Sequence, residues 1–134
     1  MTAVIPDSFR DLLTGKACGV FTTIMPDGQP QSTVIWLDFD GTFLYVNTMR
    51  GFRKEKNMRL NPKVTLLAYA LDNPLRYIEV RGCVVEMTEA GALEHLDKLS
   101  ERYTGQRPYF GGCVPAELKE HEIPVLCKIM PLHV

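Results

Sequence analysis

The chain has 134 residues and a formal net charge of -1, and 46% of its residues are hydrophobic. This length predicts one domain, residues 1–134, that buries roughly two thirds of the surface it exposes when unfolded. The near-neutral charge argues against a nucleic-acid-binding protein with a broad basic face, and no apolar run approaches the roughly 20 residues of a membrane span, so we expect a cytoplasmic protein that binds neither nucleic acid nor membrane.

Short apolar runs separated by turn residues make up the first third of the chain. An apolar stripe over 9–13 predicts a short helix that ends at Gly15. Strands are predicted over 17–24 and 31–39, joined as a hairpin by the turn residues 26–28. A third strand is predicted over 42–48. Both of its faces are apolar, so each face should be covered, as in a small barrel with a partner subunit.

The next segment, 50–63, contains six of the fifteen basic residues and a single acid. It favours helix until Asn61-Pro62 ends it, and the free N–H groups at the start of a helix favour a phosphate or carboxylate. At 3.6 residues per turn, Arg53, Lys54 and Asn57 share one face, which we expect to be exposed. The alternative is a solvated basic face without a ligand, because most charge runs are only that.

The second half of the chain continues with strands and one long helix. Strands are predicted over 64–71, 77–87 and 125–130, and Gly82 suits a bulge in the second of them. Leucines at spacings of three residues predict a helix that Thr88 caps and Gly105 ends. Residues 116–121 predict one or two further helical turns. His95 and His121 are expected on exposed helix faces.

Six short strands with peripheral helices predict a β-rich α+β domain built as an antiparallel barrel. A barrel this small has no room inside for a large ligand, so a ligand should lie on its outside or between subunits. The four cysteines form no CxxC pair and the three histidines lack ligand spacing, so no metal site is expected.

A series of different short motifs extends over nearly the whole chain. They are the segment 23–31, the strand Val34-Ile35-Trp36-Leu37, the turn Asp40-Gly41, the strand Tyr45-Val46-Asn47-Thr48, and the segments Arg53-Lys54-x-x-Asn57 and Asn61-Pro62-Lys63-Val64. Together they resemble the pyridoxamine 5'-phosphate oxidase-like flavin split-barrel superfamily. Glu79-Val80-Arg81-Gly82 and Tyr103-Thr104-Gly105 resemble its small flavin and deazaflavin oxidoreductase branch. The resemblance implies a six-stranded antiparallel split β-barrel that forms a homodimer, with FMN or the deazaflavin coenzyme F-420 in a cleft between the protomers.

The same resemblance implies a set of cofactor-binding residues. Its phosphate and ribityl-side positions match Thr48, Arg53, Lys54 and Asn57, and its strand along the cofactor ring matches Gln31, Thr33, Val34, Ile35 and Trp36. Arginine grips phosphate with two hydrogen bonds, whereas lysine adds a point charge. Trp36 has core or interface packing as its alternative role. Tyr103, Tyr109 and Phe110 either cover a substrate cleft of the partner subunit or pack locally.

The implied activity is an oxidoreductase that transfers hydride between the cofactor and a small organic substrate, with the cofactor carrying the chemistry. FMN is the first expectation and F-420 the alternative, and no residue is assigned as catalytic. The chain closes with Leu132-His133-Val134 and shows no substrate-binding Arg/His motif of the true pyridoxamine phosphate oxidase, so vitamin B6 oxidation is not expected. The alternative functions are a non-enzymatic cofactor carrier or sensor and, less favoured, a barrel that binds single-stranded nucleic acid.

Overall fold

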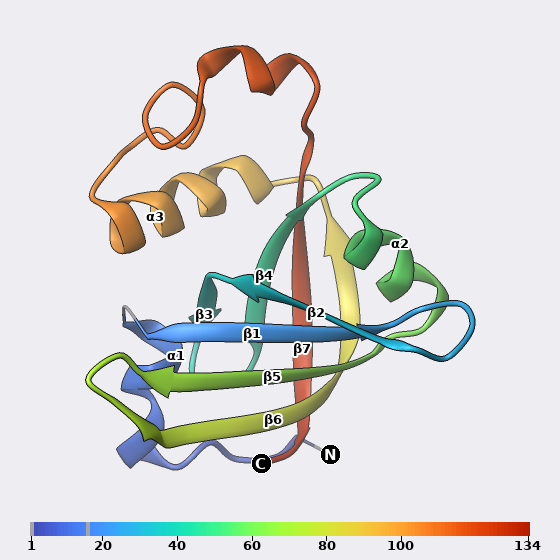
Figure 1. Ribbon diagram of the computed structural model, residues 1–134, viewed down its shortest axis with the longest axis vertical. Helices are drawn as coiled ribbons and strands as arrows, with labels where there is room; N and C mark the ends of the chain where they lie inside the picture. Colours follow the sequence, from blue (N-terminus) through green and yellow to red (C-terminus); the bar gives the residue numbers. More distant parts are fainter. Residues whose placement is uncertain (1, 16) are drawn as a thin grey trace.

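A curled antiparallel sheet, with seven strands in the part of the chain that the structure describes, forms the centre of the molecule (Figure 1). The computed structural model describes residues 2–15 and 17–134. The strands are β1 (Cys18–Ile24), β2 (Pro30–Ile35), β3 (Leu37–Phe39), β4 (Leu44–Met49), β5 (Lys63–Ala70), β6 (Asn73–Thr88) and β7 (Pro124–His133). Their order in the sheet is β2-β1-β5-β6-β7-β4-β3. The β-rich antiparallel split barrel is therefore confirmed, but the described residues form seven strands in place of six.

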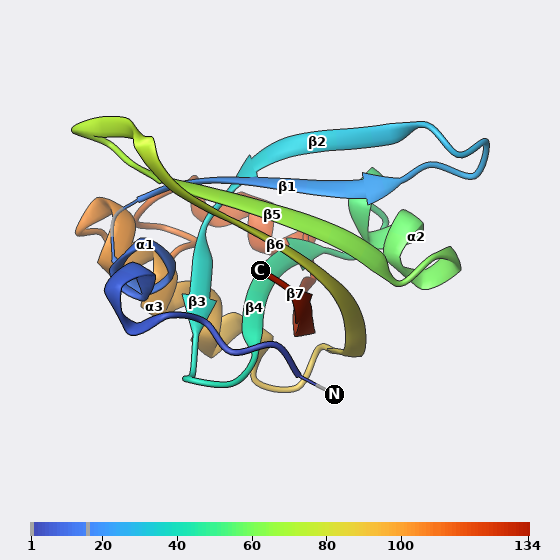
Figure 2. The same cartoon turned by 90° about the horizontal axis from the view of Figure 1, so that it is seen from below.

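The extra strand arises because the predicted strand over 31–39 is broken at Trp36. Before the break, Ile35 of β2 pairs with Gly19 of β1. After it, Leu37 of β3 pairs with Val46 of β4. Consecutive strands thus lie at opposite edges of the sheet, and Figure 2 shows β3 turned away from the direction of β2. Trp36 is the corner where the chain crosses the open side of the curl.

Strand β6 joins the two halves of the sheet. Its first part pairs with β5, and its second part pairs with β7. The pairing with β7 shifts register between Arg81 and Gly82, which confirms the predicted bulge. A Cβ atom on Gly82 would lie 2.7 Å from the Met130 carbonyl oxygen, so the close approach of the two strands requires glycine at this position.

The helices lie at the ends and edges of the sheet. They are the 3-10 turn η1 (Asp7–Phe9), α1 (Asp11–Thr14), α2 (Arg53–Leu60), α3 (Ala92–Thr104) and the 3-10 turn η2 (Ala116–Glu120). Helix α3 ends at Gly105 as predicted, in a left-handed conformation with φ 76°. The predicted Thr88 cap is wrong: α3 begins after Gly91, and the Thr88 hydroxyl accepts a hydrogen bond from the Ala90 N–H within the preceding turn.

The main core fills the inside of the curl. Its largest fully buried side chains include Phe21, Leu37, Leu44, Leu66 and Ile129. Leu12 and Leu13 of α1 are also buried there, as the stripe over 9–13 predicts. A second, smaller cluster lies between α3 and the end of β4. No helix among residues 2–15 and 17–134 is both long enough and apolar enough to cross a membrane.

Candidate functional site

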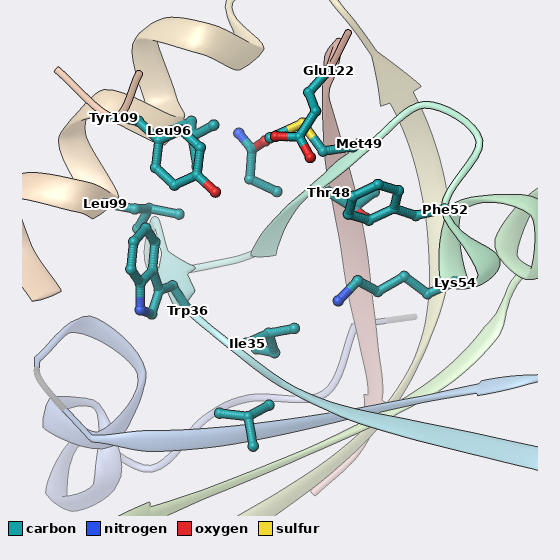
Figure 3. A pocket seen from close by; sticks show the side chains of 12 residues that line it. Ile35, Trp36, Thr48, Met49, Phe52, Lys54, Leu96, Leu99, Tyr109 and Glu122 are labelled. Carbon is teal, nitrogen blue, oxygen red and sulfur yellow. The ribbon is translucent and has the colours of Figure 1, made fainter. Parts of the chain in front are cut away.

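A pocket of about 240 Å³ lies where the second cluster meets the corner of the sheet (Figure 3). One part of its wall comes from the junction of β2 and β3 and from the start of α2: Val34, Ile35, Trp36, Phe52 and Lys54. The other part comes from the end of β4, from α3 and from the loops after α3, and it includes Thr48, Leu96, Leu99, Tyr109 and Glu122. Segments far apart in the sequence therefore meet around one largely apolar space.

Two polar groups in this pocket are placed to receive a ligand. Thr48 is only 4% exposed, and its hydroxyl has no hydrogen-bond partner in the part of the chain that the structure describes. Lys54 extends into the pocket, donates a hydrogen bond to the Thr33 hydroxyl at 3.0 Å, and has its pKa lowered by burial. A buried hydroxyl without a partner costs about 1–3 kcal/mol. Hence a ligand with an anionic or hydroxyl-bearing part would satisfy both groups.

The turn before α2 fixes where Lys54 starts. Gly51 has φ +86°, a conformation that favours glycine, and its N–H donates to the Glu55 carboxylate at 2.9 Å. Glu55 is 3% exposed and also pairs with Arg59 on the next helical turn. Because this carboxylate reaches back to the turn, the first residues of α2 have a defined orientation.

Asn57 departs from its predicted position on the exposed face of α2. It is fully buried, and its amide donates to the Thr23 hydroxyl at 3.0 Å and to the Met25 sulfur at 3.4 Å. The expectation of an exposed Asn57 is wrong, because α2 packs against β1 through Glu55, Asn57 and Met58. Two of these three residues are polar, so apolar periodicity does not reveal the buried face.

An aromatic wall bounds the pocket on the side of α3. The Trp36 ring stacks on Tyr103 with centroids 5.5 Å apart and meets the edge of Tyr109 at 6.0 Å. The Tyr103 hydroxyl accepts a hydrogen bond from the Leu37 N–H at 3.1 Å and donates to the Leu37 carbonyl at 3.2 Å. Trp36 is therefore packed against two tyrosines and also lines the pocket, while its contact with a cofactor ring stays a prediction.

A cluster of charges holds α3 in place, and we call it the Asp38 cluster. The Asp38 carboxylate, 6% exposed on β3, lies 3.0 Å from His95 Nε2, 3.2 Å from Lys98 Nζ and 2.9 Å from Arg102 Nη1. Burial raises the pKa of Asp38, but the hydrogen bonds from His95 and Arg102 and the Arg102 charge outweigh it, so this pKa lies well below its ordinary value. The expected exposure of His95 is wrong, since its side chain is only 13% exposed.

Residues 5–123 match the family described as pyridoxamine 5'-phosphate oxidase. This chain belongs to that family. The resemblance found in the sequence is thereby confirmed. No curated protein matches the chain at a significant level.

Among solved structures, this member of the pyridoxamine 5'-phosphate oxidase family is similar to an F-420 reductase, with 30% sequence identity and a TM-score of 0.81. The similarity covers 96% of this chain and 97% of that chain. A conserved hypothetical protein from Mycobacterium tuberculosis is 28% identical with a TM-score of 0.73, over 98% of this chain and 83% of that one. An FAD-binding protein from Mesorhizobium loti is 19% identical with a TM-score of 0.63, over 99% and 94%, and shows the fold alone.

In this family member the pocket brings together part of the predicted site. Val34, Ile35, Trp36, Thr48 and Lys54 line it, and Thr33 contacts Lys54. Gln31, Arg53 and Asn57 lie outside the lining: Gln31 accepts a hydrogen bond from the Thr23 hydroxyl at 3.3 Å, and Arg53 is exposed to solvent. The role of all nine residues in cofactor binding stays a prediction.

Sequence reasoning missed the residues that the end of β4, the turn before α2, helix α3 and the loop before β7 contribute to the pocket. The residues not predicted are Asn47, Met49, Phe52, Leu96, Leu99 and Glu122. Leu96 and Leu99 belong to the apolar stripe of α3, but this periodicity does not indicate against which part of the molecule the helix packs. Tyr109, one of the aromatic residues considered for a partner's cleft, lines the pocket of its own chain. Glu122 carries no sequence signal of its own.

Proposed function

We propose that this protein binds an isoalloxazine-type cofactor and catalyses hydride transfer between that cofactor and a small organic molecule. The observation that carries the proposal is the buried Thr48 hydroxyl, which has no hydrogen-bond partner among the described residues and lies in the same pocket as the Lys54 cation. Membership of the pyridoxamine 5'-phosphate oxidase family and the similarity to an F-420 reductase support it. Four free cysteines fit the reducing cytoplasm that we propose as its location.

Of the two cofactors, the deazaflavin F-420 is now favoured over FMN, which the sequence put first. The supporting observation is the F-420 reductase, which this chain matches at 30% identity over nearly the full length of both chains. The alternative function is a protein that carries or senses the same cofactor without turning it over.

The residues of the pocket fit a group of this kind. Lys54 and Thr48 would hold its anionic or hydroxyl-bearing part, through a charge and a neutral hydrogen bond. The ring of Trp36 and the side chains of Leu96 and Leu99 exclude water from the opposite wall. When bound, the cofactor supplies the hydride donor or acceptor, and the protein supplies binding, orientation and a dry surface. No side chain is required as a nucleophile.

We further propose that two copies of the chain complete the site as a homodimer. The pocket of about 240 Å³ is smaller than the roughly 300–1,000 Å³ of most ligand sites. Two apolar residues of its lining face solvent in the single chain, Val34 at 71% and Phe52 at 46% exposure. A second copy packed against them would enlarge the enclosed volume and cover both side chains.

Equilibrium binding of FMN and of F-420 to the purified, cofactor-stripped protein tests the cofactor proposal. We expect micromolar or tighter binding of one cofactor and about tenfold to hundredfold weaker binding by Lys54→Met, since a hydrogen bond to a charged group contributes about 1.5–3 kcal/mol. Lys56→Met is the matched control, because Lys56 is exposed on the same helix and lies outside the pocket.

Equal affinity of the Lys54 and Lys56 variants would remove Lys54 from the binding site. Binding of neither cofactor by the wild-type protein would overturn the proposed function as a whole. A carrier is distinguished from an enzyme by a further measurement: a carrier binds the cofactor but leaves its oxidation state unchanged over many equivalents of organic acceptor.

A further inference from the structure

Besides Lys54, Glu122 and Tyr109 bring polar groups to the pocket. Figure 3 shows Tyr109 on the α3 side of the space, Glu122 entering it from the chain that leads into β7, and Lys54 entering it from α2. Glu122 lies in the loop between η2 and β7, and Tyr109 lies in the loop after α3. The pocket therefore has a cationic end at Lys54 and an acidic end, which we define as Glu122 with Tyr109.

The carboxylate of Glu122 is available to a ligand. Its backbone N–H donates to the Leu118 carbonyl at 2.9 Å, which anchors the residue through the main chain. The ion pairs found within residues 2–15 and 17–134 do not include this carboxylate.

Tyr109 is held as a donor beside this carboxylate. Its backbone N–H donates to Asp97 at 2.8 Å, and its ring packs edge-on against Trp36 and Phe110. Burial raises the pKa of Tyr109, and the negative charge of Glu122 raises it further, so the phenol keeps its proton. The acidic end therefore offers one charged acceptor and one neutral hydroxyl donor.

We propose that this acidic end selects the substrate: a flat, mainly apolar molecule that presents an N–H donor or a cationic nitrogen to Glu122. The inference rests on the proposed function, since it names the substrate class of the same pocket. A ligand that fills the pocket displaces water from the carboxylate, and a desolvated charge without a partner is costly. An amine, amidine or protonated heterocycle restores the lost hydrogen bond, whereas a phosphate or carboxylate at this position repels Glu122.

The lining of the pocket indicates the chemistry of the part of the substrate that does not contact Glu122. Trp36, Leu96 and Leu99 present aromatic and branched apolar surface, which favours a planar ring over a flexible polar chain. A substrate with a phosphate at the acidic end is disfavoured, because its negative charge would lie against the Glu122 carboxylate.

The test uses three flat probes of the same size that differ in charge: benzamidine, benzamide and benzoate. Trp36 is the sole tryptophan and lines the pocket, so the quenching of its fluorescence reports binding directly. Titrations are made on the full chain, with and without the cofactor that it binds. We expect benzamidine to bind about tenfold more tightly than benzoate, because hydrogen bonds to charged groups are among the stronger ones.

The variants assign this preference to one residue. Glu122→Gln keeps the size of the side chain and is expected to abolish the roughly tenfold preference. Glu122→Lys is expected to invert it in favour of benzoate. Glu120→Gln is the matched control, because Glu120 is exposed on η2 and lies outside the pocket lining. Thermal unfolding of each variant verifies that it is folded.

The outcomes separate this inference from the proposed function. An unchanged preference in Glu122→Gln, or a wild-type preference for benzoate in the cofactor-loaded protein, overturns the selection by Glu122. Cofactor binding without any charge preference overturns the inference and leaves the proposed function standing. A Glu122-dependent preference in a protein that binds neither cofactor supports the acidic end while the redox function fails.

Discussion

At the scale of single residues, Asn57 shows how a polar side chain can belong to the interior of this fold. Its amide bridges α2 to the Thr23 hydroxyl of β1, and its own oxygen has no partner among the described residues. Helix α2 starts with Arg53 and the pocket residue Lys54. The position of Lys54 therefore depends on a hydrogen bond at Asn57, one turn further along the helix.

We expect Asn57→Ala to lower the free energy of unfolding by about 1–3 kcal/mol, because it leaves a buried hydroxyl without its donor and opens a small cavity. Urea unfolding followed by circular dichroism measures the loss. Lys56→Ala is the control on the exposed side of the same helix and should change stability by less than about 0.5 kcal/mol. Equal stability of the two variants would place Asn57 outside the structural contacts of α2.

The residue scale also marks the limit of sequence reasoning about the site. The basic stretch predicts an anion-binding helix face of Arg53, Lys54 and Asn57, because charge composition is local information, and of the three only Lys54 lines the pocket. It cannot distinguish Lys54 from Arg53 or Asn57, since the three share a helical face and only the packing of α2 on β1 decides which is buried. The sequence does not predict Glu122 as a pocket residue for the same reason, since only the fold brings its loop to the pocket.

At the scale of elements, the Asp38 cluster joins α3 to β3. Helix α3 supplies Leu96 and Leu99 to the pocket and Tyr103 to the stack on Trp36. Its attachment to β3 combines the hydrogen bonds of Tyr103 to the Leu37 backbone with one carboxylate that faces three basic side chains. The geometry of the aromatic wall therefore depends on the ionisation of Asp38.

Asp38→Asn is expected to lower the stability at pH 7 by about 2 kcal/mol, because the basic side chains lose a buried charged acceptor. The pKa of Asp38 in the folded protein is lower than in the unfolded chain, where an aspartate has a pKa of about 4. The charged carboxylate therefore stabilises the fold fully at pH values above about 4. This stabilisation is lost as the pH falls towards the lower pKa of the folded protein. The difference between the wild-type and variant proteins should thus be constant from pH 7 to pH 5 and shrink below about pH 4.

Urea unfolding at pH 7, 5 and 3 measures this dependence, and the fluorescence of Trp36 reports whether its stack on Tyr103 loosens. Glu94→Gln serves as the control, since Glu94 is exposed on α3 and the cluster does not include it. A stability difference that grows on acidification would contradict the assigned direction of the Asp38 pKa.

At the scale of the whole molecule, the exposed apolar residues around the pocket point to a second copy. Val34 lies on the edge strand β2 beside the pocket. We expect the wild-type protein to sediment with the mass of two chains, and Val34→Glu to raise the dimer dissociation constant at least about tenfold, because the interface would enclose an unpaired charge. Val4→Glu makes the same change at another exposed valine, away from the pocket, and should leave the dimer intact.

A single-chain mass for the wild-type protein over the micromolar range would refute the proposed homodimer. Cofactor titration of the Val34→Glu monomer then shows whether one chain suffices for binding. Retained affinity in the monomer would assign the whole site to one protomer.

Most of the architecture can be predicted from the sequence, because the turn residues of each hairpin and the apolar stripe of each helix lie within short segments of the chain. The bulge at Gly82 and the end of α3 at Gly105 follow from single glycines. The break at Trp36 could not be predicted, since the apolar run Val34-Ile35-Trp36-Leu37 continues across it without a turn residue. The chain changes edges there because β3 pairs with β4 and Tyr103 binds the backbone of Leu37, both of which are long-range contacts.

The place of β7 in the sheet has a consequence for how the protein is made. This strand follows every other strand in the chain, yet it lies between β6 and β4. While the ribosome is still synthesising Pro124–His133, β4 and β6 have no partner along these edges, and bare strand edges are templates for pairing with other chains. The sheet therefore cannot be completed before β7 has been synthesised, and until then these two strand edges are open to pairing with other chains.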